Sequence, residues 1–237
     1  MITVNIPSVR SHVVHDRKFR PWHLSGLAMW LDGADAASIA LDGSNNVSQW
    51  NDKSGNGRHV TQATSGSRPA YITAGINGLN CLSFDGSDDL MVTSGSSTIS
   101  QPNTTFVVFR PIAGGTNPQL FDGSSARQYI YFPSTTSVQA YANSALTPTI
   151  TSVVGTTSQA AVVFNGSSSV FLLNRVQISS GNLGSSGIGP EITIGANRFG
   201  GGPWKGYIAE HLIYRRMLDA SEIMQLGNYL ATKWGTP

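Results

Sequence analysis

The segment Gly206-Tyr207-Ile208-Ala209-Glu210-His211-Leu212-Ile213-Tyr214 is a mostly apolar run that carries one acid and one histidine. An apolar run of this length predicts a β-strand that is buried in a sheet. Glu210 is the only acid inside this strand, and no second acid lies near it on the same face. We therefore expect Glu210 to have a structural partner, such as Arg215 or a backbone amide, and not a catalytic role.

A helix is predicted directly after this strand, over residues 219–235. Asp219 is the expected N-cap, and Glu222 three residues later completes a capping box. Gly235 ends the helix. The apolar residues that recur at spacings of three and four are Ile223, Leu226, Leu230 and Trp234.

Toward the N-terminus, short apolar or alternating runs recur between turn residues. Such spacing predicts an all-β protein made of antiparallel hairpins, a sandwich or a barrel. The runs are Leu27–Leu31, Val47–Trp50, Asn80–Phe84, Thr105–Arg110, Gln128–Phe132, Ser137–Ala142, Gln159–Phe164, Val170–Leu173 and Glu191–Ile194. The expected turns are Asp42-Gly43, Asp85-Gly86, Asp122-Gly123 and Asn165-Gly166.

Composition limits the classes of function. The chain has 237 residues, of which 40% are hydrophobic, enough for one domain with a full core. Only 12% are charged and the formal net charge is +2, so nucleic-acid binding by the main body is not indicated. No stretch approaches the ~20 apolar residues of a membrane span, so none is predicted. Cys81 is the single cysteine, which excludes a disulfide within the chain, and its alternating surroundings predict a buried strand thiol.

Residues 1–23 differ from the rest of the chain and are interpreted as an extended basic N-terminal arm, followed by one domain over residues 24–237. The arm is either a disordered terminus or an assembly segment that a partner holds, because its own apolar content cannot offset the entropy of ordering. We expect other copies of the chain, or other proteins of an assembly, to be that partner. The predicted assembly residues are Arg10, Arg17, Lys18, Arg20 and Trp22.

Several segments, in the same order along the chain, resemble the concanavalin A-like lectin/glucanase superfamily, and in particular its laminin G-like members. The resemblance implies two curved antiparallel sheets with jelly-roll topology, in which the late strand returns beside the N-terminal strands. It implies no particular activity, because this fold carries lectins, hydrolases and structural domains alike. The segments are residues 27–32 (LAMWLD), 47–57 (VSQWNDKSGNG), 77–78 with 82–89 (NG, LSFDGSDD) and 206–214 leading into the helix.

Laminin G-like domains of this kind occur in phage particle proteins and bacterial surface proteins. The leading hypothesis is therefore a non-catalytic virion protein, a phage capsid decoration or tail component on the virion surface, fixed to other virion proteins by its arm. The alternative is a carbohydrate-binding module or lectin of a bacterial surface or secreted, extracellular system. A glycoside hydrolase needs two separated carboxylates, and the E-x-D-x-x-E pattern of the laminarinase branch is absent.

Two kinds of binding site are predicted. Sugars stack on exposed aromatic rings while amides and backbone groups bond their hydroxyls, so the candidate glycan residues are Trp204, Asn197, Arg198 and Asn51. The alternative for Trp204 is that it packs against the sandwich where its loop re-enters the sheet, whereas Trp30, Trp50 and Trp234 are expected in the core.

Asp85, Asp88 and Asp89 place three carboxylates within five residues. Their repulsion must be relieved by water, by backbone donors or by a cation, so Ca²⁺ is a candidate ligand, although the spacing matches no EF-hand.

Overall fold

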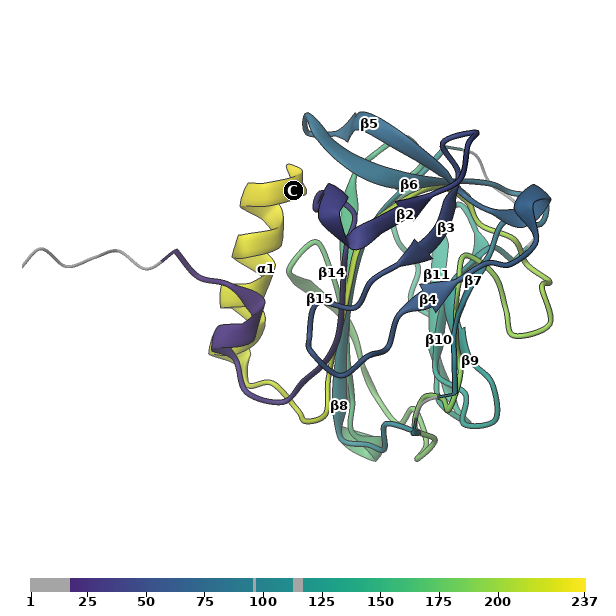
Figure 1. The fold of residues 1–237 in the computed structure, drawn as a ribbon. Helices are drawn as coiled ribbons and strands as arrows, with labels where there is room; N and C mark the ends of the chain where they lie inside the picture. Colours follow the sequence, from purple (N-terminus) through teal and green to yellow (C-terminus); the bar gives the residue numbers. More distant parts are fainter. Residues whose placement is uncertain (1–17, 96, 113–116) are drawn as a thin grey trace, which may run out of the picture.

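Two antiparallel sheets pack face to face in the computed structural model, which describes residues 18–95, 97–112 and 117–237 (Figure 1). We call one the covered sheet, because a helix packs on its outer face, and the other the open sheet. The covered sheet runs β15 (Val176–Gly181), β14 (Ser169–Leu173), β13 (Ser158–Phe164), β8 (Asn103–Pro111), β17 (Lys205–Tyr214), β6 (Leu79–Asp85) and β5 (Ala70–Ile76), with β1 (Leu27–Asp32) also paired to β17. The open sheet runs β12 (Ala145–Leu146), β11 (Ser137–Tyr141), β10 (Tyr129–Ser134), β9 (Gln119–Gly123), β16 (Ile192–Ile194), β7 (Met91–Thr93), β4 (Val60–Thr61), β3 (Val47–Trp50) and β2 (Ile39–Leu41).

This architecture confirms the predicted all-β jelly-roll sandwich, including the return of the late strand to the N-terminal one. Strand β17 pairs with β1 over Leu27–Asp32 and with β8 and β6 on its two sides. The described residues also form short 3-10 helices, which are η1 (Pro21–His23), η2 (Ala36–Ser38), η3 (Ser65–Ser67) and η4 (Gly166–Ser168).

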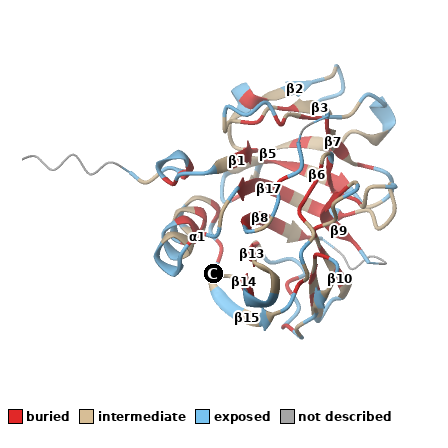
Figure 2. Cartoon of the chain, turned by 90° about the horizontal axis from the view of Figure 1, so that it is seen from below, coloured by how far each residue is buried: buried red, intermediate tan, exposed pale blue. Residues whose placement is uncertain are grey.

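The central strands of the covered sheet alternate between two apolar layers. In β8, Val107 and Phe109 point into the core between the sheets, whereas Phe106 and Val108 point toward the helix. Strands β8, β13 and β17 are therefore buried on both faces, and buried residues follow them in Figure 2. This two-sided burial explains why their sequences are apolar runs and not alternating patterns.

Helix α1 (Ala220–Trp234) covers the outer face of the covered sheet. Asp219 accepts a hydrogen bond from the Glu222 amide and Glu222 reaches back to the Asp219 amide, so the predicted capping box is present. Gly235 adopts a left-handed conformation (φ 68°) and ends the helix as expected. Leu226, Leu230 and Trp234 carry the buried face. No helix in the described ranges has the length and apolarity to cross a membrane.

A β-bulge in β17 places two consecutive residues on the helix side of the covered sheet. The register of β17 with β8 shifts between Ile208 and Glu210, so Ala209 and Glu210 both face α1 while His211 faces the opposite sheet. A bulge re-aims side chains in this way because one strand carries an extra residue. The shift brings Glu210 under the helix.

One predicted turn is a strand end instead. Asp122-Gly123 closes strand β9 and pairs with both β10 and β16, so the Asp-Gly pair is held in the ladder. The correction matters because β9 lies beside the candidate site described next.

Candidate functional site

Three tyrosines form a platform on the outer face of the open sheet. Tyr129 and Tyr131 alternate along β10 with the buried Ile130 and Phe132, so both face solvent. Tyr141 lies opposite Tyr129 on β11, and the two rings stack with centroids 4.6 Å apart and an interplanar angle of 7°. Tyr131 meets Tyr129 edge-on at 5.6 Å. The sheet thus presents a continuous aromatic surface.

An ion pair between the buried Asp122 and the half-buried Arg127 lies at the edge of the platform. Asp122 is the register neighbour of Tyr129 and accepts two hydrogen bonds from Arg127, 3.1 Å from Nε and 2.7 Å from Nη2. The guanidinium lies over the Tyr129 ring at 4.8 Å. Burial acts to lower the pKa of Arg127, but the hydrogen bonds and charge of Asp122 outweigh it and the pKa is raised. Burial also raises the pKa of Tyr129 to about 12, so its hydroxyl stays protonated at neutral pH.

Beside the platform lies a cavity of about 430 Å³. Its lining combines rings, amides and one guanidinium, and consists of Asn117, Gln119, Arg127, Tyr129, Tyr131, Asn197 and Gly202. Gln119 is only 8% exposed, and its Oε1 accepts no hydrogen bond from any part of the chain that the structure describes. A buried acceptor without a donor costs roughly 1–3 kcal/mol.

The loop after β16 shapes the rim of the cavity. Asn197 Oδ1 accepts from the amides of Phe199 and Gly201 at 2.8 and 2.9 Å, which folds the loop back on itself. The Gly202 carbonyl accepts a hydrogen bond from the backbone amide of Gln119. Gly202 has a φ of 58°, and a Cβ at this position would lie 2.5 Å from the Asn117 carbonyl oxygen. Glycine is therefore required at this close approach.

The predicted glycan residues separate into two groups in the structure. Asn197 lines the cavity, and Arg198 lies beside it, where its amide donates to Asp122 and its side chain to the Ser124 carbonyl. Asn51 directly follows β3 near the far edge of the open sheet, where it accepts a hydrogen bond from Gln49. The structure does not bring Asn51 to the cavity.

Trp204 is not an exposed binding residue, which corrects that prediction. It is 1% exposed and packs edge-on against Phe109, with centroids 5.7 Å apart, in the core between the sheets. The alternative, packing against the sandwich, is the one observed. Trp30, Trp50 and Trp234 are buried as expected. The sequence signal for the tyrosine platform is the alternation Tyr129-Ile130-Tyr131-Phe132, which places both tyrosines on one face of a strand.

The three aspartates do converge. Ligand oxygens of Asp85, Asp88 and Asp89 lie within 4.8 Å of one another. Asp89 is buried and accepts from the Asp85 amide at 2.9 Å, and burial raises the pKa of Asp89 to about 6. Hard carboxylate oxygens are the ligands that Ca²⁺ takes, and these three would supply part of its shell. Calcium binding stays a prediction.

Glu210 has structural partners, but not the predicted Arg215. Its Oε1 accepts from Trp30 Nε1 at 2.7 Å, and its Oε2 accepts from Trp234 Nε1 at 2.6 Å and from Lys233 Nζ at 2.7 Å. Lys233 also binds Asp32 at 2.6 Å. Glu210 is fully buried and burial raises its pKa. It therefore joins β17, β1 and α1 without access to a substrate.

The basic arm is described only from Lys18 onward, so Arg10 and Arg17 lie outside the described residues. The Pro21 carbonyl accepts from the Tyr214 hydroxyl at 3.0 Å. Trp22 is 57% exposed, and its ring lies 5.4 Å from that of Trp30.

Comparison with known proteins identifies the family to which this fold belongs. Residues 84–224 match the model of a family described as the concanavalin A-like lectin/glucanases superfamily, and the chain belongs to that family. A search of curated protein sequences found no match.

Three solved structures illustrate the range of proteins with this fold. Domain 4 of AbnA, an extracellular arabinanase from Geobacillus stearothermophilus in complex with arabinotriose, is similar with a TM-score of 0.60 and 16% identity, over 85% of this chain and 98% of that one. The binding domain of Paraclostridial Mosquitocidal Protein 1 is similar with a TM-score of 0.63 and 13% identity, over 90% of this chain and 55% of that one. Trypanosoma rangeli sialidase in complex with sialic acid is similar with a TM-score of 0.61 and 14% identity, over 90% of this chain and 34% of that one. At these identities the likeness establishes the fold alone.

Proposed function

We propose that this chain is a non-catalytic glycan-binding domain and that sugars bind at the tyrosine platform and its cavity. The observation that carries the proposal is that two half-buried tyrosine rings line one cavity together with the amide side chains of Asn117, Gln119 and Asn197. Sugar rings present apolar C–H faces that stack on aromatic rings, and their hydroxyls form hydrogen bonds with amide groups.

The chemistry of the cavity favours binding over hydrolysis. None of the seven residues that line it carries a carboxylate, and Asp122, the acid that binds the lining residue Arg127, is held by that guanidinium and by the Arg198 amide. Glycoside hydrolysis requires two carboxylates flanking the bond. The arabinanase domain is bound to an arabinose trimer in its structure, which supports an extracellular or surface role in which a sandwich of this kind holds a polysaccharide.

A glycan array followed by titration calorimetry tests this function, with arabino-oligosaccharides among the probes. Tyr129→Ala should lower affinity at least tenfold, because loss of the ring removes both stacking and the support of Arg127. Tyr207→Ala is the matched control: Tyr207 is a half-buried tyrosine on the other sheet, with Arg110 4.5 Å above its ring, and it lies outside the cavity. Equal effects of the two substitutions would contradict the assignment of the site.

A second candidate function is a structural role in a phage particle, with the sandwich facing outward. It is favoured by the cationic N-terminal residues together with Trp22, which leaves more than half of its surface exposed where the described chain begins. Gradient sedimentation of the native source tests it. Migration of the protein with large particles would support the particle role, and migration as a small free species would contradict it and leave the glycan-binding proposal intact.

A further inference from the structure

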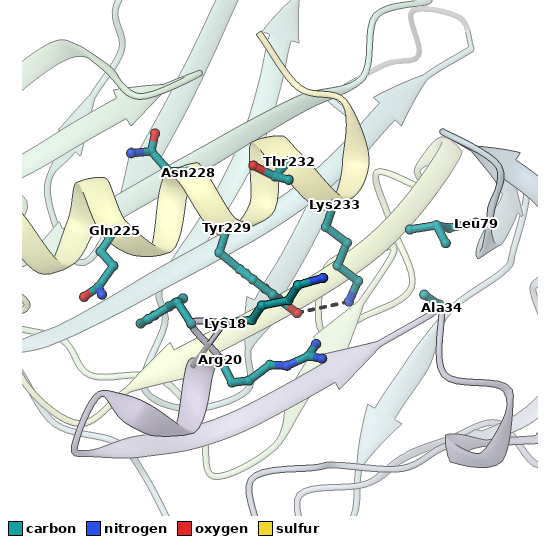
Figure 3. Close-up of a pocket in the computed structure, with 10 residues that line it drawn as sticks. Lys18, Arg20, Ala34, Leu79, Gln225, Asn228, Tyr229, Thr232 and Lys233 are labelled. Carbon is teal, nitrogen blue, oxygen red and sulfur yellow. Dashed lines mark hydrogen bonds between the residues drawn. The ribbon is translucent and has the colours of Figure 1, made fainter. Parts of the chain in front are cut away.

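A groove of about 680 Å³ runs along α1, on the side of the molecule away from the tyrosine platform. Figure 3 shows Tyr229 and Lys233 of the helix facing Lys18 and Arg20 of the N-terminal segment, with Ala34 and Leu79 at one end. Its volume falls within the ~300–1,000 Å³ range of ligand pockets.

The N-terminal segment is a fixed wall of this groove. The Phe19 ring contacts the Tyr229 ring edge-on at 5.8 Å, and the Pro21 carbonyl is held by the Tyr214 hydroxyl. Beyond these anchors, Trp22 packs on Trp30. The groove is therefore a built feature that both the helix and the start of the described chain maintain.

We propose that this groove binds residues 1–9 of a second copy of the chain. These nine residues carry no charged side chain, so their side chains add no positive charge beside Lys18, Arg20 and Lys233. Ile2, Val4 and Ile6 alternate, and an extended strand places such a set on one face. That face is an apolar ridge suited to a groove whose walls include Phe19, Ala34 and Leu79.

The length and direction of the chain favour a second copy, and not the same molecule, as the source of the residues 1–9 that enter the groove. Seventeen residues precede Lys18 and span up to roughly 55–60 Å when extended, enough to reach a neighbouring molecule. The chain's own first residues could return to the groove only if residues 10–17 reversed direction beside it. That stretch contains no glycine or proline, and Ser11 and Asp16 are its only residues of the types that turns favour. Reciprocal exchange between two copies gives a closed twofold dimer.

Cysteine pairing tests the proposal on the full chain. Cys81 is buried, so engineered cysteines dominate the exposed thiols. Val4→Cys is mixed with Thr232→Cys, an exposed helix position in the groove lining, after one of the two has been labelled with ¹⁵N. Mild oxidation should give a disulfide-linked heterodimer, recognised by its mass, as the main product. Thr135→Cys, at an exposed position outside the groove lining, is the matched control and should form at least tenfold less heterodimer with Val4→Cys.

Two results would overturn the proposal. Absence of the heterodimer, or equal yields with Thr232→Cys and Thr135→Cys, would show that the segment does not enter the groove of another copy. A Val4→Cys/Thr232→Cys double variant that closes only an intrachain disulfide at low concentration would assign the groove to the chain's own segment. Circular dichroism of each variant confirms that it is folded before oxidation.

Discussion

His211 is a buried base without a partner. It lies between the sheets with its ring 4.9 Å from that of Phe121, and neither ring nitrogen has a hydrogen-bond partner among the described residues. Burial lowers the pKa of His211 to about 3 from an ordinary value of 6.5. The folded protein therefore keeps this imidazole neutral at pH values where the unfolded chain protonates it.

This difference makes stability depend on pH. Between pH 6.5 and about 3 the unfolded state binds the extra proton, so the free energy of unfolding falls as pH is lowered, by at most about 1.4 kcal/mol per pH unit. His211→Leu removes this contribution and should flatten the decline between pH 7 and pH 4. Urea titrations of the wild-type protein and His211→Leu across that range measure the free energy of unfolding at each pH. If the two proteins lose stability in parallel as pH is lowered, another group governs the acid response.

Asp89 makes the free energy of unfolding depend on pH in the opposite direction. Burial raises its pKa to about 6 from 3.8, so its charged form is disfavoured in the folded protein and stability falls as pH rises from 3.8 through about 6. Without calcium, Asp89→Asn should raise the melting temperature at pH 7. With calcium in excess, the wild-type protein should gain stability and Asp89→Asn should not. Asp35→Asn, outside the cluster, is the control and should keep the calcium response.

At the scale of elements, α1 is attached to the sandwich by a buried charge cluster as well as by apolar packing. Glu210 lies on the helix side because of the bulge in β17, and it binds Trp234 and Lys233 of α1 and Trp30 of β1. One carboxylate thus joins three elements. Removing it would leave two indole N–H groups and a lysine with fewer partners in a dry site.

Glu210→Ala should therefore cost about 3–5 kcal/mol of unfolding free energy, the usual effect of breaking a buried pair. Glu210→Gln keeps one acceptor and should cost less. Glu191→Ala, at an exposed glutamate, should change stability by no more than about 0.5 kcal/mol. Chemical denaturation gives all three values. A loss below 1 kcal/mol for Glu210→Ala would show that apolar packing alone holds α1.

Sequence patterns predicted the elements better than the site. The cap residues Asp219, Glu222 and Gly235 bracket α1 within a residue of its observed ends, because capping depends on local chemistry. The cavity depends instead on β16 lying beside β9, which brings Asn197 and Gly202 to the tyrosines of β10; these strands are far apart in the chain, and no local pattern reveals their pairing. Trp204 follows the run Gly200-Gly201-Gly202, which is typical of an exposed loop, whereas its ring packs against Phe109 in the core.

At the scale of the whole molecule, the two sheets present different outer faces. The covered sheet lies under α1, and the open sheet carries the tyrosine platform on the opposite side (Figures 1 and 2). A ligand on the platform should therefore affect only one face of the sandwich.

Hydrogen exchange provides the measurement. A bound glycan should slow amide exchange in β9, β10 and the loop over residues 197–202, with no change in α1. Protection that appeared along α1 instead would place the sugar in the groove and contradict the proposed site. The same experiment with Tyr207→Ala should reproduce the wild-type pattern, since that residue lies on the other sheet.

The opposition of the two faces has a consequence for cross-linking. Copies that joined along their α1 sides would turn their tyrosine platforms outward, away from the contact. Their two cavities would then point in opposite directions, so one assembly would bridge two glycan-bearing surfaces or two polysaccharide chains. It would gain no avidity on a single flat surface, because its geometry forbids both cavities from engaging that surface together.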